Sequence, residues 1–183
     1  MATVYLALLH HPVYNKKGDI VTTCVTGFDL HDIARSAVTF GVKKYYVVNP
    51  LPTQRDFARR IFEFWMDETS LEFNWTRVEA FRLIAIKAEL EEVIEEITKA
   101  EGRRPKIVAT SAKDRSDIGF EALKAEIGAG TPTLLIFGTG WGLAEEVFAK
   151  VDHTLPPISG TGAYNHLSVR SACAIILDRL LGS

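Results

Sequence analysis

The chain has 183 residues, of which 47% are hydrophobic and 24% are charged, the balance of a folded globular protein. This length suits a single α/β domain that can bury a core. A formal net charge of −2 leaves the molecule without an overall basic field, which argues against tight nonspecific nucleic-acid binding by a monomer but leaves room for a local basic patch.

The cysteines and the N-terminus indicate a cellular compartment. Cys24 and Cys173 lie in apolar surroundings without the spacing of a metal-binding pair, so we expect buried free thiols in a reducing cytoplasm. The chain begins at once with strand-like residues and shows neither a charged n-region nor a cleavage site, so no signal peptide is expected. No uncharged apolar run approaches the length of a membrane span. A cytoplasmic location without membrane attachment is therefore predicted.

Short β-rich runs alternate with helical patterns along the chain. The continuous apolar run Thr3–Leu9 is typical of a strand buried on both faces. Apolar residues at helical spacing predict a helix from Asp29 to Phe40, with Asp29 as its N-cap and Gly41 just beyond its end. Further helices are predicted at residues 52–66, 90–101, 118–127, 143–149 and 166–181, and further strands at residues 45–48, 83–86, 106–109 and 133–137.

This alternation predicts the fold class, an α/β protein whose mostly parallel sheet is flanked by helices on both faces. No repeat or low-complexity linker interrupts it, so residues 1–183 are predicted to form one domain. Residues 51–101 carry more Asp and Glu than Lys and Arg and are interpreted as a partly helical, acidic insert, with residues 51–81 as a helical elaboration. The alternative is that these acidic residues simply solvate helices.

A glycine-rich turn follows the clearest strand and reads LLIFGTGWGL from Leu134 to Leu143. Ligands bind at the carboxyl ends of strands in a parallel sheet, and glycine lets the backbone approach them closely. The GxGxG spacing differs from the GxGxxG of dinucleotide folds, and no Gly-Lys-Ser/Thr follows as in a phosphate-binding P-loop. The turn alone therefore predicts a ligand at a strand end, or else only a tight turn.

A proline- and glycine-rich loop comes next and reads LPPISGTGAY from Leu155 to Tyr164. The prolines fix its backbone, while its exposed backbone groups suit the edge of an adenine. Asn165, His166 and Ser168 follow at the start of the last predicted helix, where capping alone would explain them.

Together these segments resemble motifs two and three of the SPOUT RNA methyltransferases: a strand, a glycine turn and a helix, then the loop LPPISG and the sequence NHLSVRSA opening a terminal helix. The resemblance implies that residues 133–183 are threaded as a C-terminal deep trefoil knot, the SPOUT or α/β-knot fold, which binds S-adenosylmethionine between three loops. The implied cofactor-binding residues are Thr110, Ser111, Ala112, Phe137, Gly138, Thr139, Gly140, Trp141, Gly142, Leu155, Pro157, Ile158, Ser159, Gly160, Tyr164, Asn165, His166 and Leu167.

The first predicted helix is similar to motif one of the ribose 2′-O-methyltransferase branch, whose arginine-bearing helix ends in Phe-Gly-Val, here Phe40-Gly41-Val42. The resemblance implies that Arg35 acts at the ribose hydroxyl or at a nearby phosphate. A guanidinium can hold a phosphate through two parallel hydrogen bonds. The alternative is an ordinary arginine on a helix surface.

The chain departs from the family pattern at three places. Asp29 stands where motif one usually has asparagine, the glycine turn lacks the glutamate common in motif two, and Tyr164-Asn165-His166 replaces the usual Ser-Leu-Asn of motif three. We therefore regard Asp29, His166 and Ser168 as secondary catalytic candidates, and methylation of a base stays open beside methylation of the ribose 2′-oxygen.

The resemblance implies an S-adenosylmethionine-dependent methyltransferase that acts on tRNA or rRNA and releases S-adenosylhomocysteine. It also implies a homodimer in which each site is completed by the partner chain. No extra RNA-binding domain is evident, so a separate or fused partner is expected to supply recognition. Such a homodimer would let two modest basic patches, including Arg103, Arg104, Lys106, Lys113 and Arg115, make one RNA surface.

Two other functions fit parts of the sequence. One is a noncatalytic S-adenosylmethionine-binding or dimerisation module that assists another methyltransferase, which the missing motif-two glutamate favours. The other is an unrelated α/β protein whose glycine turn binds a nucleotide. No metal site is expected, because His10, His11, His31 and His153 lack tight ligand spacing.

Overall fold

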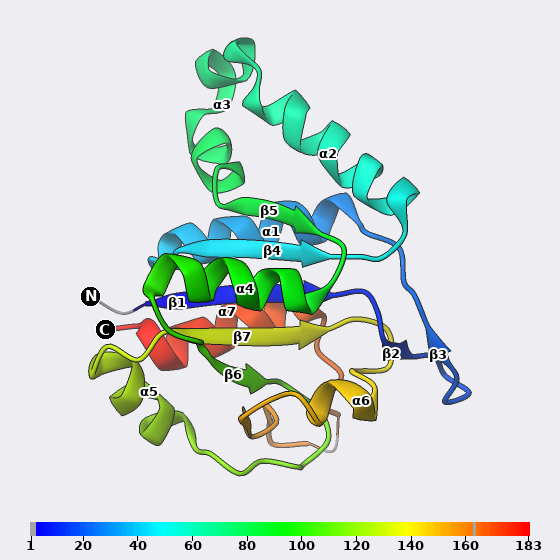
Figure 1. The fold of residues 1–183 in the computed structure, drawn as a ribbon, viewed down its shortest axis with the longest axis vertical. Helices are drawn as coiled ribbons and strands as arrows, with labels where there is room; N and C mark the ends of the chain where they lie inside the picture. The colour runs from blue at the N-terminus through cyan, green and yellow to red at the C-terminus, as the bar shows by residue number, and fades with distance from the viewer. Residues whose placement is uncertain (1–2, 163) are drawn as a thin grey trace.

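The computed structural model describes residues 3–162 and 164–183, and residue 163 of the predicted proline-glycine loop lies outside the described residues. Six parallel strands form its main sheet in the order β5-β4-β1-β7-β6-β8 (Figure 1). Their bounds are β1 Val4–Leu9, β4 Lys44–Val48, β5 Ile84–Lys87, β6 Lys106–Ala109, β7 Thr133–Gly138 and β8 His153–Thr154. The predicted α/β fold class with a parallel sheet is confirmed.

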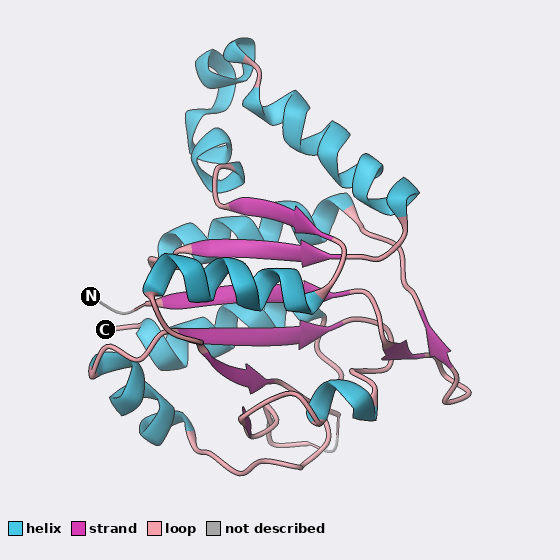
Figure 2. Cartoon of the chain, in the orientation of Figure 1, coloured by secondary structure: helices cyan, strands magenta, loops and turns pink. Residues whose placement is uncertain are grey.

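Helices cover both faces of this sheet, as predicted (Figure 2). On one face lie α1 (Gly27–Thr39), α5 (Phe120–Gly128) and α7 (Val169–Leu181), and on the other lie α4 (Leu90–Glu101) and α6 (Glu145–Phe148). The side chains of β1 alternate between these layers, with Leu6 and Leu8 packed beside α1 and α7, and Tyr5 and Ala7 beside α4. Since both layers are apolar, the strand needs the continuous apolar run that the sequence shows.

The first helix begins earlier than the sequence predicts. Thr26 is its N-cap, and the Thr26 hydroxyl accepts the backbone N–H of Asp29 at 3.2 Å. Asp29 stands three residues further on, where its carboxylate accepts the Thr26 hydroxyl at 2.7 Å. The prediction of Asp29 as N-cap is therefore wrong: Thr26 and Asp29 form a reciprocal cap, which is typical of a Ser/Thr followed three residues later by an acidic residue.

The last helix begins later than predicted, at Val169 instead of His166. Ser168 is its N-cap, and the Ser168 hydroxyl accepts the backbone N–H of Ser171 at 3.2 Å. Asn165 and His166 therefore belong to the preceding loop and not to the helix.

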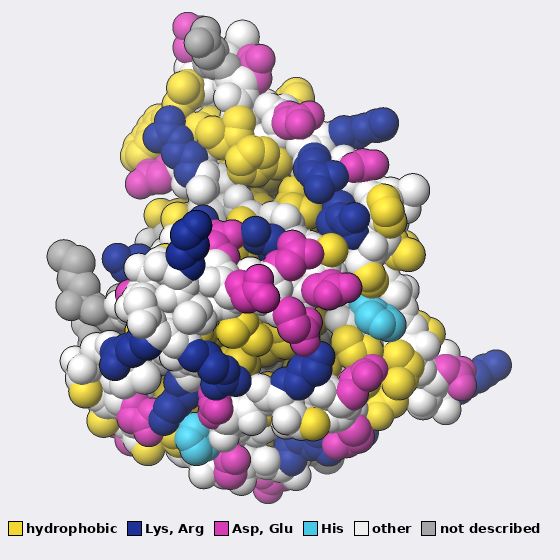
Figure 3. All heavy atoms as spheres, viewed as in Figure 1, with side chains coloured by type: hydrophobic (Ala, Val, Ile, Leu, Met, Phe, Trp, Pro, Cys, Tyr) yellow, Lys and Arg dark blue, Asp and Glu magenta, His cyan; other side chains and the backbone are white. Residues whose placement is uncertain are grey.

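Residues 51–101, predicted as one acidic insert, contain two different structures. The helices α2 (Pro52–Met66) and α3 (Glu68–Phe81) form an arm that projects beyond the edge strand β5, whereas β5 and α4 belong to the main sheet and its cover (Figure 1). His31 of α1 anchors the arm, because its ring centroid lies 5.5 Å from that of Trp65 and 4.6 Å from that of Phe81. Hydrophobic side chains also reach the surface of the arm, among basic and acidic ones (Figure 3). The most exposed of them are Phe64, Phe73 and Trp75.

A small antiparallel hairpin, β2 (Val13–Tyr14) and β3 (Ile20–Val21), leaves the carboxyl end of β1 and was not predicted. Two-residue strands carry no measurable alternation, so the sequence pattern had nothing to indicate them. Within the described residues, no helix combines the length and the apolar character needed to cross a bilayer. The threading of residues 133–183 as a knot stays a prediction.

Candidate active site

A cavity of about 970 Å³ opens at the carboxyl edge of the sheet. Its walls come from the three segments that the sequence analysis assigned to a cofactor, which follow β6, β7 and β8. Fourteen of the predicted residues line it: Thr110, Ser111, Ala112, Phe137, Gly138, Thr139, Gly140, Trp141, Gly142, Ile158, Tyr164, Asn165, His166 and Leu167. Parallel strands bring their carboxyl ends to the same edge, which is why segments distant in sequence meet here.

Four predicted cofactor residues are not among the residues that line this cavity: Leu155, Pro157, Ser159 and Gly160. Leu155 is fully buried, and its backbone N–H bonds the carbonyl of Ala109 at 3.0 Å, so it extends the β8–β6 pairing into the core. Pro156 and Ile158 of the same loop do reach the cavity. The cofactor-binding role of the four residues outside the lining stays a prediction, as does that of the other predicted residues.

The glycine turn is held against the β2–β3 hairpin at close range. The backbone N–H of Trp141 bonds the carbonyl of Tyr14 at 2.9 Å, and the N–H of Tyr14 bonds the carbonyl of Gly142 at 2.9 Å. A Cβ at Gly140 would lie 2.8 Å from that Tyr14 carbonyl oxygen, and the residue adopts a φ of +59°. Only glycine fits this position without strain, so the turn is shaped by its contact with the hairpin.

The loops after β6 and β8 are joined to each other. The side-chain amide of Asn165 donates to the carbonyl of Ala112 at 2.7 Å. Asp117 accepts the backbone N–H of Thr154 at 2.8 Å, which fixes the start of the second loop. The first of these bonds joins two cavity-lining residues, and both bonds join residues more than 30 positions apart in sequence.

One carboxylate stands at the cavity wall in a largely buried position. Asp29 is 9% exposed and accepts the Thr26 hydroxyl, and the Nε of Arg170 lies 3.9 Å from its carboxylate. Arg170 also lies 3.7 Å from Asp32 and over the exposed ring of Phe28. Arg170 is not among the lining residues, but its guanidinium, which can hold an anion, stands beside a lining carboxylate that can accept a proton.

The other catalytic candidates lie in different settings. Ser168 lines the cavity, but its hydroxyl caps α7. His166 also lines the cavity and meets the ring of Tyr164 edge to face at 5.5 Å between centroids. Arg35 lies exposed on α1 and is not among the lining residues. Its catalytic role stays a prediction.

Lys113 and Arg115, expected only in an RNA surface, also line the cavity. Other lining residues were not predicted as site residues at all: Tyr14, Thr23, Cys24, Thr26, Leu143, Glu145, Phe148, Pro156, Val169, Ala172 and Ile176. Cys24 is exposed, so the prediction of two buried thiols is wrong for it. Cys173 is buried as predicted, and burial raises the pKa of its thiol to about 12. The segment after β1 could have been included in the prediction, because its strand ends at the same edge as β6 and β7.

The predicted basic surface is divided between the two edges of the sheet. Lys113 and Arg115 stand at the carboxyl edge, where Arg115 pairs with Glu145 at 2.7 Å and its hydrogen bond lowers the pKa of that carboxyl. At the opposite edge, Arg103 and Arg104 precede β6 and Lys106 is its first residue. These residues form two separate groups within one chain, and their combination into one RNA surface in a homodimer stays a prediction.

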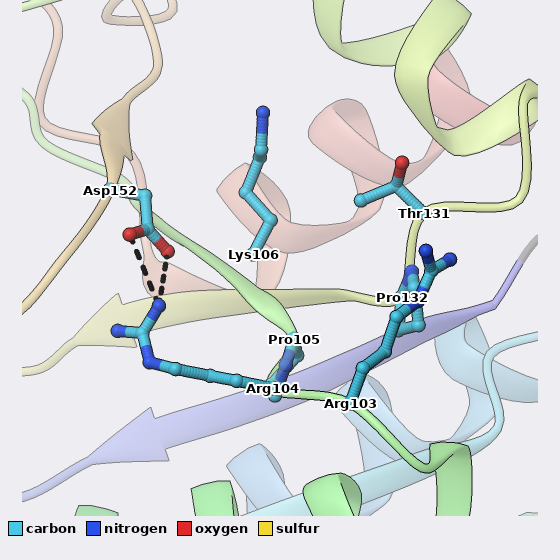
Figure 4. Close-up of a pocket in the computed structure, with 7 residues that line it drawn as sticks. All are labelled: Arg103, Arg104, Pro105, Lys106, Thr131, Pro132 and Asp152. Atoms are coloured by element: carbon cyan, nitrogen blue, oxygen red, sulfur yellow. Dashed lines mark hydrogen bonds and ion pairs between the residues drawn. The ribbon is translucent and has the colours of Figure 1, made fainter.

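The opposite edge carries its own, smaller cavity of about 260 Å³ (Figure 4). The guanidinium of Arg104 reaches the carboxylate of Asp152 through two hydrogen bonds of 2.9 and 3.1 Å. Lys106 pairs with Glu126. The basic charges of Arg104 and Lys106 are thus balanced by carboxylates of the same chain. Among the described residues, no cluster of three or more His, Cys, Asp or Glu side chains is arranged to hold a metal ion.

Comparison with known proteins agrees with this geometry. Residues 3–182 match the model of a family described as SAM-dependent RNA methyltransferase. The chain is 43% identical over 179 residues to an uncharacterized protein of Aquifex aeolicus (strain VF5), and the match covers 97% of this chain and 87% of that protein. It is 41% identical to a tRNA (guanine-N(1)-)-methyltransferase of Oleidesulfovibrio alaskensis, covering 98% of this chain but only 42% of that protein.

Solved structures share the fold at low sequence identity. The SpoU methyltransferase AviRb of Streptomyces viridochromogenes, solved in complex with AdoMet, superposes with a TM-score of 0.63 at 18% identity, covering 98% of this chain and 57% of that one. A TrmH/SpoU tRNA modifying enzyme of A. aeolicus gives a TM-score of 0.58 at 17% identity, covering 98% and 74%. The predicted likeness of the α/β fold to SpoU methyltransferases is thereby confirmed, whereas the knot stays a prediction. With the family match spanning nearly the whole chain, the protein belongs to the family of S-adenosylmethionine-dependent RNA methyltransferases.

Proposed function

We propose that this enzyme binds S-adenosylmethionine in the cavity at the carboxyl edge and transfers the methyl group to tRNA. The observation that carries the proposal is the convergence of three predicted segments, after β6, β7 and β8, on one cavity. Its family uses this cofactor and methylates RNA.

The cavity suits a molecule that joins an adenosine to a charged amino acid. Its volume of about 970 Å³ lies at the upper end of the roughly 300–1,000 Å³ usual for small-molecule sites, which leaves space beside the cofactor for a nucleotide. Phe137, Ile158 and Ile176 offer apolar walls for a planar base, while Ser111 and Lys113 offer polar groups. The backbone of the glycine turn is open to close approach by a ligand.

When bound, the cofactor supplies a methyl group activated by its sulfonium. The chain must align the acceptor atom and take up its proton. We assign proton uptake to Asp29, whose largely buried carboxylate lines the cavity. We assign phosphate binding to Arg170 beside it, because a guanidinium presents a fork of donors to phosphate oxygens.

Arg35 is proposed to act in a homodimer. On its own chain it lies exposed on α1, away from the cavity lining, which is compatible with a place at the partner's site. Support for a dimer comes from exposed apolar side chains near the cavity, on Phe28, Tyr164 and Leu167. Sedimentation velocity of the purified chain tests this, and a monomer at every concentration would contradict it.

The choice of tRNA rests on two relatives named tRNA (guanine-N(1)-)-methyltransferase, from Oleidesulfovibrio alaskensis and Nitratidesulfovibrio vulgaris. The chain spans only 42% of either relative, so the named activity need not reside in the matched part. Because the relatives are longer than this chain, we propose that a fused or separate partner supplies RNA recognition. We place this activity in the cytoplasm. The acceptor is proposed to be either guanine N1 or a ribose 2′-oxygen.

Methyl transfer to purified tRNA tests the proposal and identifies the acceptor. The enzyme is incubated with labelled S-adenosylmethionine and total tRNA, and the digested nucleosides are separated by mass spectrometry. Label in 1-methylguanosine or in a 2′-O-methylnucleoside supports the proposal and distinguishes the two acceptors. Cofactor binding without transfer to any tRNA, even with a tRNA-binding partner added, would instead indicate the noncatalytic module.

A further inference from the structure

His10 is a buried polar residue that neither the family motifs nor the proposed mechanism uses. It follows β1 directly, is 0% exposed, and its backbone N–H bonds the carbonyl of Val48 at 3.0 Å. Its ring Nε2 is buried and has no hydrogen-bond partner among the described residues. A buried polar ring atom without such a partner, at the carboxyl edge of the sheet, calls for a physical reason.

The other ring nitrogen begins a chain of hydrogen bonds that ends in the glycine turn. The Nδ1 of His10 lies 3.0 Å from the hydroxyl of Thr23, which in turn contacts the hydroxyl of Thr139. The Thr139 hydroxyl donates to the carbonyl of Leu9 at 3.2 Å. Thr23 and Thr139 both line the cavity, so the chain runs beneath its floor from β1 to the glycine turn.

One assignment of the protons uses every bond of this chain. Each threonine hydroxyl has one proton to donate, and that of Thr23 has a second acceptor in the backbone carbonyl of His10 at 3.4 Å. When Thr139 donates to Leu9 and Thr23 donates to Thr139, the remaining bond requires His10 to donate from Nδ1 to Thr23. The Nε2 of His10 is then the unprotonated nitrogen, which avoids a buried N–H without a partner.

We propose that His10 is a positioning residue for the cofactor cavity, which acts through Thr23 to orient Thr139 and thereby sets the glycine turn against which S-adenosylmethionine binds. The inference rests on the proposed function, because it concerns the same cavity. Thr23 is held on its far side as well, since the side-chain amide of Asn49 donates to its carbonyl at 3.0 Å. His10 thus connects the end of β1 to Thr23 and, through it, to Thr139, both of which line the cavity.

Burial supports this role. It lowers the pKa of His10 to about 4, so the ring stays neutral near neutral pH. A neutral ring keeps one nitrogen as a donor and the other without a proton, which is what the direction of the chain requires.

The tautomer of His10 is the first test, and it needs no cofactor. Long-range ¹H–¹⁵N correlation spectra of the ¹⁵N-labelled full chain are recorded near neutral pH, with His10→Asn to assign the signals. The expected result is a protonated Nδ1 and an unprotonated Nε2. A protonated Nε2 would overturn the proposal, whether or not S-adenosylmethionine binds.

The second test measures S-adenosylmethionine affinity by calorimetry. His10→Leu removes the donor, and we expect Kd to rise about tenfold, the effect of losing one buried hydrogen bond. His10→Asn places an amide N–H where Nδ1 stood, so it is expected to restore Kd to within about threefold of the original. An unchanged Kd in His10→Leu, while the unaltered chain binds, would contradict the proposal. Failure of the unaltered chain to bind would contradict the proposed function instead.

Two further variants separate positioning from general damage to the fold. Thr23→Val interrupts the chain with a side chain of the same shape, and His10→Leu should add no further loss of affinity to it, because residues that act through one another are not additive. Additive losses would show that His10 does not act through Thr23. His31→Leu is the matched control: its ring is also partly buried, but it packs on the arm and is not among the cavity residues, so Kd should not change.

Discussion

The two edges of the parallel sheet use charge in different ways. At the amino edge, Arg104 and Lys106 are neutralised by Asp152 and Glu126, and the cavity there measures only about 260 Å³. At the carboxyl edge, loops from three strands surround a cavity of about 970 Å³ that holds a largely buried carboxylate at Asp29. The comparison teaches that a cluster of basic residues in sequence is a weaker sign of function than convergence of strand ends.

Asp29→Asn tests the chemistry assigned to the carboxyl edge and should have the largest effect. The amide keeps an oxygen to accept the Thr26 hydroxyl, so the helix cap survives. It cannot take up a proton, so methyl transfer is expected to fall by about 100-fold or more. The rate is measured with labelled cofactor and tRNA, and calorimetry should show cofactor affinity unchanged. An Asp29→Asn enzyme with full activity would remove Asp29 from the mechanism.

The pH dependence of stability tests whether the ring of His10 is buried and neutral at the carboxyl edge. Because burial lowers the pKa of His10 to about 4, the unfolded chain binds a proton more readily than the folded one between about pH 6.5 and pH 4. The contribution of neutral His10 to the free energy of unfolding is therefore complete above about pH 6.5. About 3 kcal/mol of that free energy should be lost as the pH falls to about 4. Urea denaturation at pH 7 and pH 4 measures this loss. The loss should be smaller in His10→Asn, and equal losses in both proteins would contradict the burial of a neutral His10 ring.

Gly140→Ala tests the shape of the glycine turn. The added Cβ would approach the Tyr14 carbonyl oxygen to 2.8 Å at a φ of +59°, so the turn must shift away from the hairpin. We expect S-adenosylmethionine to bind about tenfold more weakly, the result of about 1–2 kcal/mol of strain at the site. Gly128→Ala is the matched control, because its Cβ would meet no atom within 4 Å and Gly128 is not among the cavity residues. Equal affinities in the two variants would show that the turn does not shape the site.

Arg104→Ala tests the amino edge of the sheet and should have the smallest effect of these four substitutions and conditions. Its ion pair with Asp152 is half exposed, and such pairs contribute less than about 1 kcal/mol. Asp152 keeps its bond from the backbone N–H of Ile107 at 2.7 Å, which limits the loss further. Urea denaturation should show this small change and calorimetry an unaltered cofactor affinity. A marked loss of cofactor binding would mean that the two edges are not functionally separate.

The sequence predicted the parts of the molecule whose signal is local and repeated. The strand runs Thr3–Leu9 and Leu134–Phe137 are apolar on both faces, and the structure confirms them as the two central strands. The loop residues resembling the family motifs do reach one cavity, for the most part. Resemblance, rather than periodicity, identified the cofactor.

What could not be predicted depends on contacts between distant residues. The N-caps Thr26 and Ser168 moved the starts of two helices, because capping depends on a few hydrogen bonds and not on apolar spacing. Thr23 lies 116 positions from Thr139, so no sequence window contains their contact. Cys24 has apolar neighbours in sequence, yet its side chain lies exposed beside the cavity.

The most direct test of the central claim is titration of the ¹⁵N-labelled chain with S-adenosylmethionine, followed by amide correlation spectra. The predicted result is that shifts concentrate at the carboxyl edge, in residues 110–112, 137–142 and 158–168, with the amides of residues 103, 104, 106 and 131 unmoved. Shifts centred on the amino edge, or no shifts at saturating cofactor, would contradict it.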